Sequence, residues 1–292
     1  MQPDLSDIQP VLLCGGAGSR LYPLSTPEMP KPYLNLISED TSLLQETAMR
    51  VKGAKSPVII CHEDHVDLTL QQLDQVNIRA EMLIAEPVRK NTGPAVALVT
   101  HALADEADPV LLFLPCDHKI GDGEAFHAAL KKGEVAANGE SIVLFAEEPQ
   151  YAETGYGYIS LEQGNDAGVS KIRSFHEKPC EQTARQYIQD GYLWNTGIIM
   201  ARVSVLREAF KGDAPDIWKC VTTPDLLIKV EKQNHPGIPL LSAALKIFNA
   251  MPGISFDVAI LEKYEHLECV PVSMKWADIG HFGALERKSG AK

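Results

Sequence analysis

The stretch Val11-Leu12-Leu13-Cys14-Gly15-Gly16-Ala17-Gly18-Ser19-Arg20-Leu21-Tyr22-Pro23-Leu24 runs from apolar residues into a glycine-rich turn, and Pro30-Lys31-Pro32 follows it. The apolar part is typical of a strand buried in a parallel sheet. Three glycines in four positions let backbone N–H groups approach an anion without interference from a Cβ atom. Arg20 can grip a phosphate with its planar guanidinium, and Lys31 adds a point charge. We therefore interpret this stretch as a phosphate-binding turn.

Two better-known glycine motifs do not match the turn. A dinucleotide fingerprint requires a third glycine where this chain has Leu21. A P-loop requires Gly-Lys followed by Ser or Thr, whereas the first lysine after the turn is Lys31, between two prolines. A glycine turn that merely ends a strand is the alternative, and the nearby arginine and lysine argue against it.

Length and charge limit the classes of protein that need to be considered. A chain of 292 residues with 45% hydrophobic content can bury a large core, and no repeat or linker divides residues 1–292, so we expect a single domain. The formal net charge of −12 disfavours nucleic acid and anionic membranes as partners, because both attract basic surfaces. An anionic substrate must therefore meet cations that are concentrated locally.

Several features favour a cytoplasmic location. The longest apolar run, residues 110–115, is far shorter than the ~18 residues that a membrane helix needs. The N-terminus carries Asp4 and Asp7 rather than a basic start and an apolar segment. The six cysteines are widely spaced and form no Cys-x-x-Cys pair, so we expect reduced thiols.

Strand and helix patterns alternate along the first half of the chain. Short apolar runs predict strands at 57–61, 80–85, 109–114 and 141–146. Helical patterns alternate with these strands at 43–51, around 68–73, after Thr92 and at 124–137. We predict that Ser42 and Gln45 form a capping box for the first of these helices and that Thr92 caps the third. This alternation predicts a Rossmann-like, mainly parallel sheet with helices on both faces, whose ligands gather at the carboxyl ends of the strands.

Beyond Pro149 the pattern changes to a smaller mixed or antiparallel β part. We predict that 155–159 pairs with 169–176 through a polar turn at 164–168, and that 192–201 is a further strand. Residues 203–233 read as helix broken by Pro215 and Pro224, 255–264 as helix and 270–276 as the last strand.

Two acidic residues follow apolar segments and are candidate metal ligands. Asp117 stands in Leu114-Pro115-Cys116-Asp117-His118, directly after the most apolar strand. A carboxylate there is costly unless it is paired or binds a cation, and capping the next helix is the alternative. Asp278 stands in Trp276-Ala277-Asp278-Ile279-Gly280, where an ordinary turn is the alternative.

These motifs occur in the order of a known family. The glycine turn with Arg20 and Lys31, the Leu-Pro-x-Asp-His segment, Phe175-His176-Glu177-Lys178-Pro179 and the segment around Asp278 resemble the sugar-1-phosphate nucleotidylyltransferases. The resemblance covers roughly residues 8 to 288. Residues 86–95 and the stretch around Asp257 are similar to the mannose-1-phosphate guanylyltransferase branch of that family. The resemblance implies transfer of a nucleotidyl group from GTP to mannose 1-phosphate, with release of pyrophosphate and no covalent enzyme intermediate.

The resemblance also implies a role for each motif residue. About 8–150 would be a nucleotide-binding half and about 151–288 a sugar-phosphate-binding half. The nucleotide would be bound by Cys14, Gly15, Gly16, Gly18, Ser19, Glu86, Asn91, Thr92 and Pro94. The sugar phosphate would be bound by Gly157, Glu177, Lys178, Asn195 and Asp257, with Glu177 on the hydroxyls and Lys178 on the phosphate. The catalytic residues would be Arg20, Lys31, Asp117 and Asp278, the two aspartates holding Mg²⁺, or Mn²⁺ in its place.

Residue types alone leave alternatives open. A Glu-Lys pair such as Glu177 and Lys178 is usually a solvated ion pair. Lys90, Tyr22 and Thr196 depart from the residues usual in that branch, so UTP or ATP with glucose 1-phosphate is an alternative substrate pair. A catalytically inactive sugar-nucleotide-binding subunit is a further alternative, although no charged site residue is missing. Relatives in this family commonly form homodimers.

Overall fold

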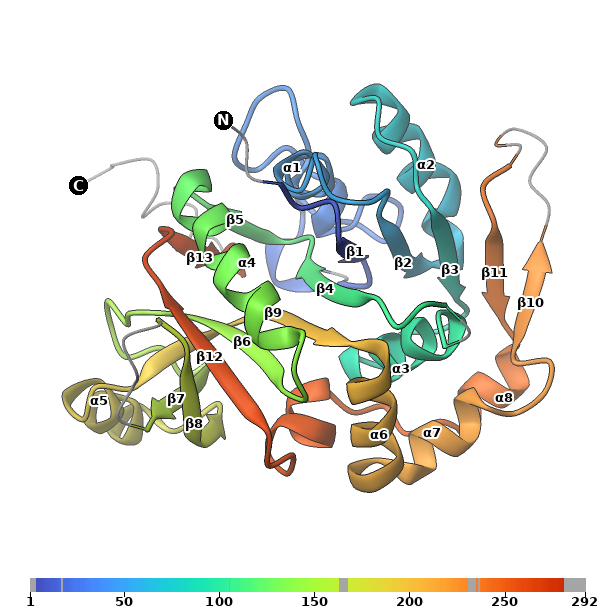
Figure 1. The fold of residues 1–292 in the computed structure, drawn as a ribbon. Helices are drawn as coiled ribbons and strands as arrows, with labels where there is room; N and C mark the ends of the chain where they lie inside the picture. Colours follow the sequence, from blue (N-terminus) through green and yellow to red (C-terminus); the bar gives the residue numbers. More distant parts are fainter. Residues whose placement is uncertain are drawn as a thin grey trace.

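A twisted mixed sheet runs through the molecule. The computed structural model describes residues 4–16, 18–104, 106–162, 168–230, 235 and 237–280 (Figure 1). Within these residues the sheet has eleven strands in the order β10-β11-β3-β2-β1-β4-β9-β6-β12-β8-β7. A separate two-stranded sheet pairs β13 with β5.

The first half confirms the expected alternation of strands and helices. The parallel strands are β1 (Ile8–Leu13), β2 (Val58–His62), β3 (Met82–Glu86) and β4 (Val110–Pro115). The helices between and after them are α1 (Leu43–Arg50), α2 (Val66–Gln75), α3 (Thr92–Ala102) and α4 (Gly123–Ala137), with short 3₁₀ turns η1 (Ser19–Leu21), η2 (Lys31–Tyr33) and η3 (Glu63–His65). The predicted capping box of Ser42 and Gln45 starts α1. The cap of α3 is Asn91 rather than Thr92, because the Asn91 side chain accepts from the Thr92 N–H.

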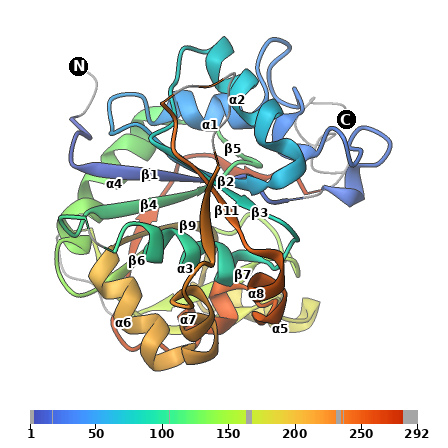
Figure 2. The same cartoon turned by 90° about the vertical axis from the view of Figure 1, so that its right-hand side faces the viewer.

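Helices cover both faces of the sheet, as the apolar strands require. Figures 1 and 2 show α1 and α2 on one side of strands β1 to β4, and α3, α6, α7 and α8 on the other. Alternate residues of one strand serve the two cores: Val11 packs into the core that contains α3, and Leu12 into the core that contains α1 and α2. Both side chains are fully buried.

The second half extends the same sheet. β9 (Leu193–Arg202) lies antiparallel between β4 and β6 (Ile142–Glu147), and β12 (Leu267–Val272) continues parallel to β6. The predicted antiparallel pair is confirmed as β7 (Gly157–Leu161) and β8 (Ser170–Glu177). The turn expected at 164–168 lies outside the described residues, except for Gly168. An unpredicted helix, α5 (Glu181–Gln189), follows β8.

The helix expected over 203–233 is correct only in its first part. α6 (Val203–Asp213) is followed by α7 (Pro215–Val221), which Pro215 begins rather than breaks, because its fixed φ suits the first turn of a helix. After a positive φ of 62° at Asp225 the chain forms β10 (Leu227–Val230) instead of helix. Pairing with β11 (Leu240–Ala243) supplies tertiary hydrogen bonds that outweigh local helix propensity.

Two further elements differ from the expected ones. α8 (Leu245–Ala250) was not predicted, and the helix expected at 255–264 is the π-helix η4 (Asp257–Leu261). The last strand expected at 270–276 is divided into β12 and β13 (Trp276–Asp278). β13 leaves the main sheet to pair with β5 (His118–Ile120), a strand too short for a sequence pattern to reveal.

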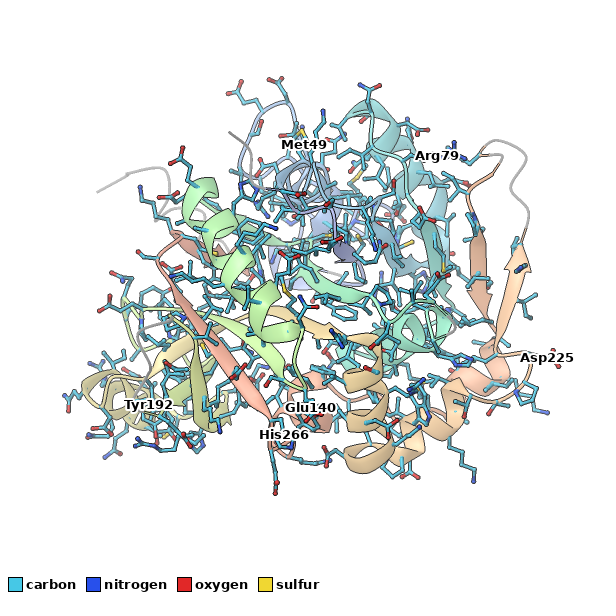
Figure 3. The ribbon with its side chains drawn as sticks, viewed as in Figure 1. Met49, Arg79, Glu140, Tyr192, Asp225 and His266 are labelled. Atoms are coloured by element: carbon cyan, nitrogen blue, oxygen red, sulfur yellow. The ribbon has the colours of Figure 1, made fainter. Side chains whose placement is uncertain are left out.

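The β10–β11 hairpin is also held from the side of α2. Figure 3 shows Arg79, which follows α2, near the end of the hairpin, where its Nη2 donates to the Gly237 carbonyl at 2.9 Å. The same view places Asp225 at the outer edge of the molecule. Among the described helices, none is long and apolar enough to cross a membrane.

Candidate active site

The glycine turn packs closely against Lys31. Gly18 has a φ of 65°, and a Cβ atom added there would lie 2.4 Å from the Cβ of Lys31. Glycine is required for both reasons, the left-handed backbone and the close approach of the η2 segment. The Gly18 carbonyl accepts from the Ser25 hydroxyl, which holds this end of the turn.

Lys31 joins the two predicted metal ligands. Its ammonium lies 2.8 Å from Asp117 Oδ2 and 2.8 Å from Asp278 Oδ1, and its side chain is 4% exposed. Burial works against the charge on Asp117, but contact with His118 and Lys31 outweighs it and lowers the Asp117 pKa. The Asp117 carboxylate therefore stays ionised, and it lies beside Asp278 because both side chains contact the same buried cation.

The β5–β13 pair explains why residues so distant in sequence meet. Asp278, the last residue of β13, lies opposite His118, the residue after Asp117. The Trp276 indole donates to His118 Nδ1 at 3.2 Å, so in the neutral ring the proton is on Nε2, which lies 3.4 Å from Asp117 Oδ1. The Trp276–His118 contact thus holds Asp117 beside Asp278.

Two further side chains of the glycine turn, those of Arg20 and Cys14, lie close to the acidic pair. A Cβ atom on Gly280 would lie 3.1 Å from Asp278 Oδ2 and 3.5 Å from Arg20 Nη2, which places the exposed Arg20 guanidinium beside the acidic pair. Cys14 is buried, with its Sγ 3.3 Å from Cys116 Sγ, so its side chain packs beneath the turn. Ser19, in η1, is exposed.

A cavity of about 540 Å³ opens beside the turn at the carboxyl ends of the parallel strands. Several residues predicted to bind the nucleotide line it together with one aspartate: Gly15, Gly16, Glu86, Asn91, Thr92 and Asp117. Pro94 is buried in the first turn of α3 and does not line the cavity. The cavity therefore lies where the glycine turn predicts that a nucleotide binds.

Glu86 is the most unusual group in this cavity. It ends β3, is 5% exposed, and its Oε1 has no hydrogen-bond partner among the described residues. A Cβ atom on Gly15 would lie 3.5 Å from its Oε2, so the carboxyl group faces the turn. Burial raises the pKa of Glu86 to about 8, despite the opposing charge of Arg89. A buried carboxyl oxygen without a partner among the described residues is a candidate acceptor for the donors of a ligand.

The start of α3 is held in a conformation that is unusual for a residue other than glycine. Asn91 has a φ of 71°, and its side chain caps the helix through the Thr92 N–H at 2.9 Å. Such backbone strain is found most often at ligand sites. The N-terminus of α3 and its cap form one wall of the cavity.

The residues predicted to bind the sugar phosphate form a second cluster. A Cβ atom on Gly157 would lie 2.9 Å from Glu177 Oε2 and 3.3 Å from the Asn195 Cβ. Asn195 Nδ2 donates to Asp257 Oδ1 at 3.1 Å. Burial, with Glu177 nearby, raises the pKa of Asp257 to about 6. Lys178, at a φ of 46°, pairs its ammonium with Glu177.

Sheet topology joins this cluster to the acidic pair. Because β9 runs antiparallel to β4, its first residues lie at the edge where β4 ends. A Cβ atom on Gly197 would lie 3.5 Å from Pro115 and 3.7 Å from His118. The pairings Tyr158–Trp194 and Gly157–Glu177 then extend the same edge outward to β7 and β8.

Sequence reasoning missed part of the cavity wall. Arg89, Lys90 and Gly253 line the cavity as well. Arg89 and Lys90 stand inside the motif that was recognised, so their charge could have been considered. Gly253 comes from a loop after α8, and no local pattern marks it.

The donor set near Lys31 fits a divalent cation. One ligand atom from each of Asp117, His118 and Asp278 can lie within 4.8 Å of the others, and carboxylate oxygens are the donors that Mg²⁺ and Mn²⁺ prefer. Both nitrogens of His118 already face partners, which leaves the two aspartates as the natural ligands.

Comparison with known proteins identifies the family of the chain. The sequence model of the family described as nucleotidyl transferase matches residues 9–291, so the chain belongs to that family. It is 37% identical over 282 residues to an alginate biosynthesis protein, AlgA, of Pseudomonas aeruginosa, covering 94% of this chain and 57% of that protein. It is 36% identical over 290 residues to the mannose-1-phosphate guanylyltransferase of Escherichia coli, covering 96% and 59%. The chain thus spans less than two thirds of the length of these relatives.

A solved structure shares the fold over nearly the whole chain. A Thermus thermophilus protein described as a mannose-1-phosphate geranyltransferase superposes with a TM-score of 0.82 at 29% identity, covering 98% of this chain and 80% of that one. The likeness extends across β9 and the second half. It supports the expected Rossmann-like class with its β elaboration.

Proposed function

We propose that the chain transfers the guanylyl group of GTP to mannose 1-phosphate, giving GDP-mannose and pyrophosphate. The family match supports nucleotidyl transfer, and relatives named mannose-1-phosphate guanylyltransferase support this substrate pair. The site supports it through one cavity beside a glycine turn, an acidic pair, and a carboxylate-rich cluster at the same sheet edge.

The environment of Glu86 is the observation that most favours guanine as the base of the nucleotide. Guanine presents two adjacent donors, N1–H and the N2 amino group, and one carboxylate can accept from both. Adenine and uracil each place an acceptor on the corresponding edge, next to their donor, and it would face the carboxylate unfavourably. Burial keeps the Glu86 carboxyl group mainly protonated at neutral pH in the empty cavity, so guanine would bind with release of that proton, and its two donors would then stabilise the carboxylate. The buried, unpartnered group therefore favours guanine.

The reaction needs positioning and charge neutralisation rather than a covalent intermediate. An oxygen of the sugar phosphate attacks the α-phosphorus in line, the bond to the β-phosphate breaks, and the electron pair leaves with pyrophosphate. The attacking oxygen is already anionic, so it requires no general base. Arg20 beside the acidic pair is placed to neutralise charge on the triphosphate, and Lys178 that on the sugar phosphate.

A divalent cation would be held by Asp117 and Asp278, where it would neutralise the phosphate charge. We propose Mg²⁺ for this position, with Mn²⁺ as a substitute. Lys31 holds the two carboxylates side by side, since it contacts both.

Further parts of the proposal concern the molecule as a whole. Residues 1–292 would act as one domain, with the nucleotide mainly on 8–150 and the sugar phosphate mainly on 151–288. Free cysteines and a nucleoside triphosphate substrate support a cytoplasmic location. Ile228 and Val230 on the outer strand β10 are exposed, and we propose this edge as the place to seek a homodimer contact.

A matrix of GTP, UTP and ATP against mannose 1-phosphate and glucose 1-phosphate tests the function by pyrophosphate release. We expect GTP with mannose 1-phosphate to have the highest kcat/KM. Preference for UTP or ATP with glucose 1-phosphate would favour the alternative enzyme, and GDP-mannose binding without turnover would favour an inactive subunit. In Glu86→Gln we expect kcat/KM for GTP to fall about 10²-fold or more, while the KM for mannose 1-phosphate changes little.

A further inference from the structure

Lys90 lines the nucleotide cavity, yet its charge does not face into it. The Lys90 Nζ donates to the carbonyl of Asn249 at 2.7 Å and to that of Met251 at 2.8 Å. Asn249 belongs to the last turn of α8, and Met251 is its C-cap. Two of the three ammonium donors therefore satisfy carbonyls that the end of a helix leaves unpaired.

The segment that Lys90 holds, residues 249–257, continues along the start of α3. The Gly93 N–H donates to the Ile254 carbonyl at 3.0 Å, and the Phe256 N–H donates to Thr92 Oγ1 at 2.8 Å. The approach is close, because a Cβ atom on Gly93 would lie 2.7 Å from the Ile254 oxygen. Figure 2 shows α8 and α3 on the same side of the sheet.

The same segment reaches both clusters of the site. Gly253 forms part of the cavity wall, and Asp257 contacts Asn195 in the second cluster. A displacement of residues 249–257 would therefore move a wall of the nucleotide cavity and the position of Asp257 together.

We propose that Lys90 is a positioning residue that fastens residues 249–257 to the Lys90–Gly93 turn, so that one ammonium sets the geometry of both substrate sites. The identity of the two substrates rests on the proposed function, whereas the attachment of residues 249–257 by Lys90 does not.

Arg89 provides a contrast in the same motif. Its side chain is exposed, and its Nε donates to the Gly15 carbonyl at 3.3 Å, so its guanidinium belongs to the mouth of the cavity.

The test compares Lys90→Met with Lys90→Arg, since arginine can still donate to two carbonyls and methionine cannot. Lys263→Met is the matched control: the Lys263 ammonium donates to the carbonyl of Asp213, at the end of α6, at 3.1 Å. Hydrogen exchange is measured on the amides of Gly93 and Phe256 in the substrate-free protein. We expect at least tenfold faster exchange in Lys90→Met, and wild-type exchange in Lys90→Arg and Lys263→Met.

Kinetics provide the second readout. In Lys90→Met we expect the KM values for both the triphosphate and the sugar phosphate to rise several-fold, with Lys90→Arg restoring most of the loss. Unchanged exchange in Lys90→Met would overturn the fastening, whatever the substrates prove to be. Unchanged exchange with a higher KM for the triphosphate alone would instead identify Lys90 as a cation that binds phosphate.

Discussion

At the scale of single residues, Glu86 shows how a buried carboxyl group can lower stability. Its pKa of about 8 means that the folded chain retains a proton which the unfolded chain releases near pH 4.5. The folded state thus binds more protons between these values, so the free energy of unfolding falls as pH rises from about 4.5 to 8. The carboxyl group is kept in the cavity in spite of this cost.

We therefore expect Glu86→Gln to be more stable than the wild-type chain above pH 8, because glutamine has no charge to bury. The two proteins should differ little at pH 5, where Glu86 is protonated. Thermal unfolding between pH 5 and 9 measures this. An equal Tm difference at all pH values would contradict the pKa assignment.

We propose that Lys178 binds the phosphate of the second substrate. Its ammonium is largely exposed and pairs with Glu177 at the sugar-phosphate cluster, so Lys178→Ala should leave the fold intact. We expect a tenfold or greater rise in the KM for the sugar phosphate and a small change in that for GTP, because a cation facing one phosphate binds it in ground and transition states alike. Steady-state kinetics with each substrate varied measure this, and equal effects on both would remove Lys178 from that role.

At the scale of elements, the glycine turn is shaped by what packs behind it. In Gly18→Ala the new methyl group meets the Lys31 side chain and the backbone keeps an unfavourable positive φ. We expect turnover to fall at least 10²-fold, because Lys31 can no longer hold both aspartates in place. Gly53→Ala is the control: its φ is 111°, but no atom lies within 4 Å of the added Cβ, so its cost should be seen in Tm alone. Similar kinetics for both variants would mean that the contact with Lys31 does not matter.

At the scale of the whole molecule, the acidic pair depends on the meeting of β5 and β13. Asp117→Asn and Asp278→Asn should each abolish most turnover, and the double variant should be little worse than either single one. Residues that act as a unit show this non-additivity. Turnover measured against Mg²⁺ and Mn²⁺ concentration tests it, and excess metal should partly restore the single variants. Additive losses with a lower Tm would indicate two separate structural acids.

Candidate site residues could be predicted from the sequence wherever the residues that act together are close neighbours in the chain. The glycine turn with Arg20, the acid after β4 and the motif from Glu86 to Thr92 each lie within a few consecutive residues, and strand ends of a parallel sheet must meet at one edge. The alternation of strands and helices was readable for the same reason, since burial of each element depends on its own apolar pattern. Residues 227–230 were assigned wrongly because their state depends on a partner, β11, that local patterns do not reveal.

Only the tertiary structure decided how these parts face one another. The Lys31 contact with both aspartates, the turning of Glu86 toward Gly15 and the fastening of Lys90 to the end of α8 join segments far apart in the chain. Distances of this kind depend on strand order and on the exit of β13 from the main sheet. The sequence by itself determined which residues are ionisable and which strands are apolar, because both are local properties. The fold decided which charges are neighbours, because that depends on contacts summed over the whole molecule.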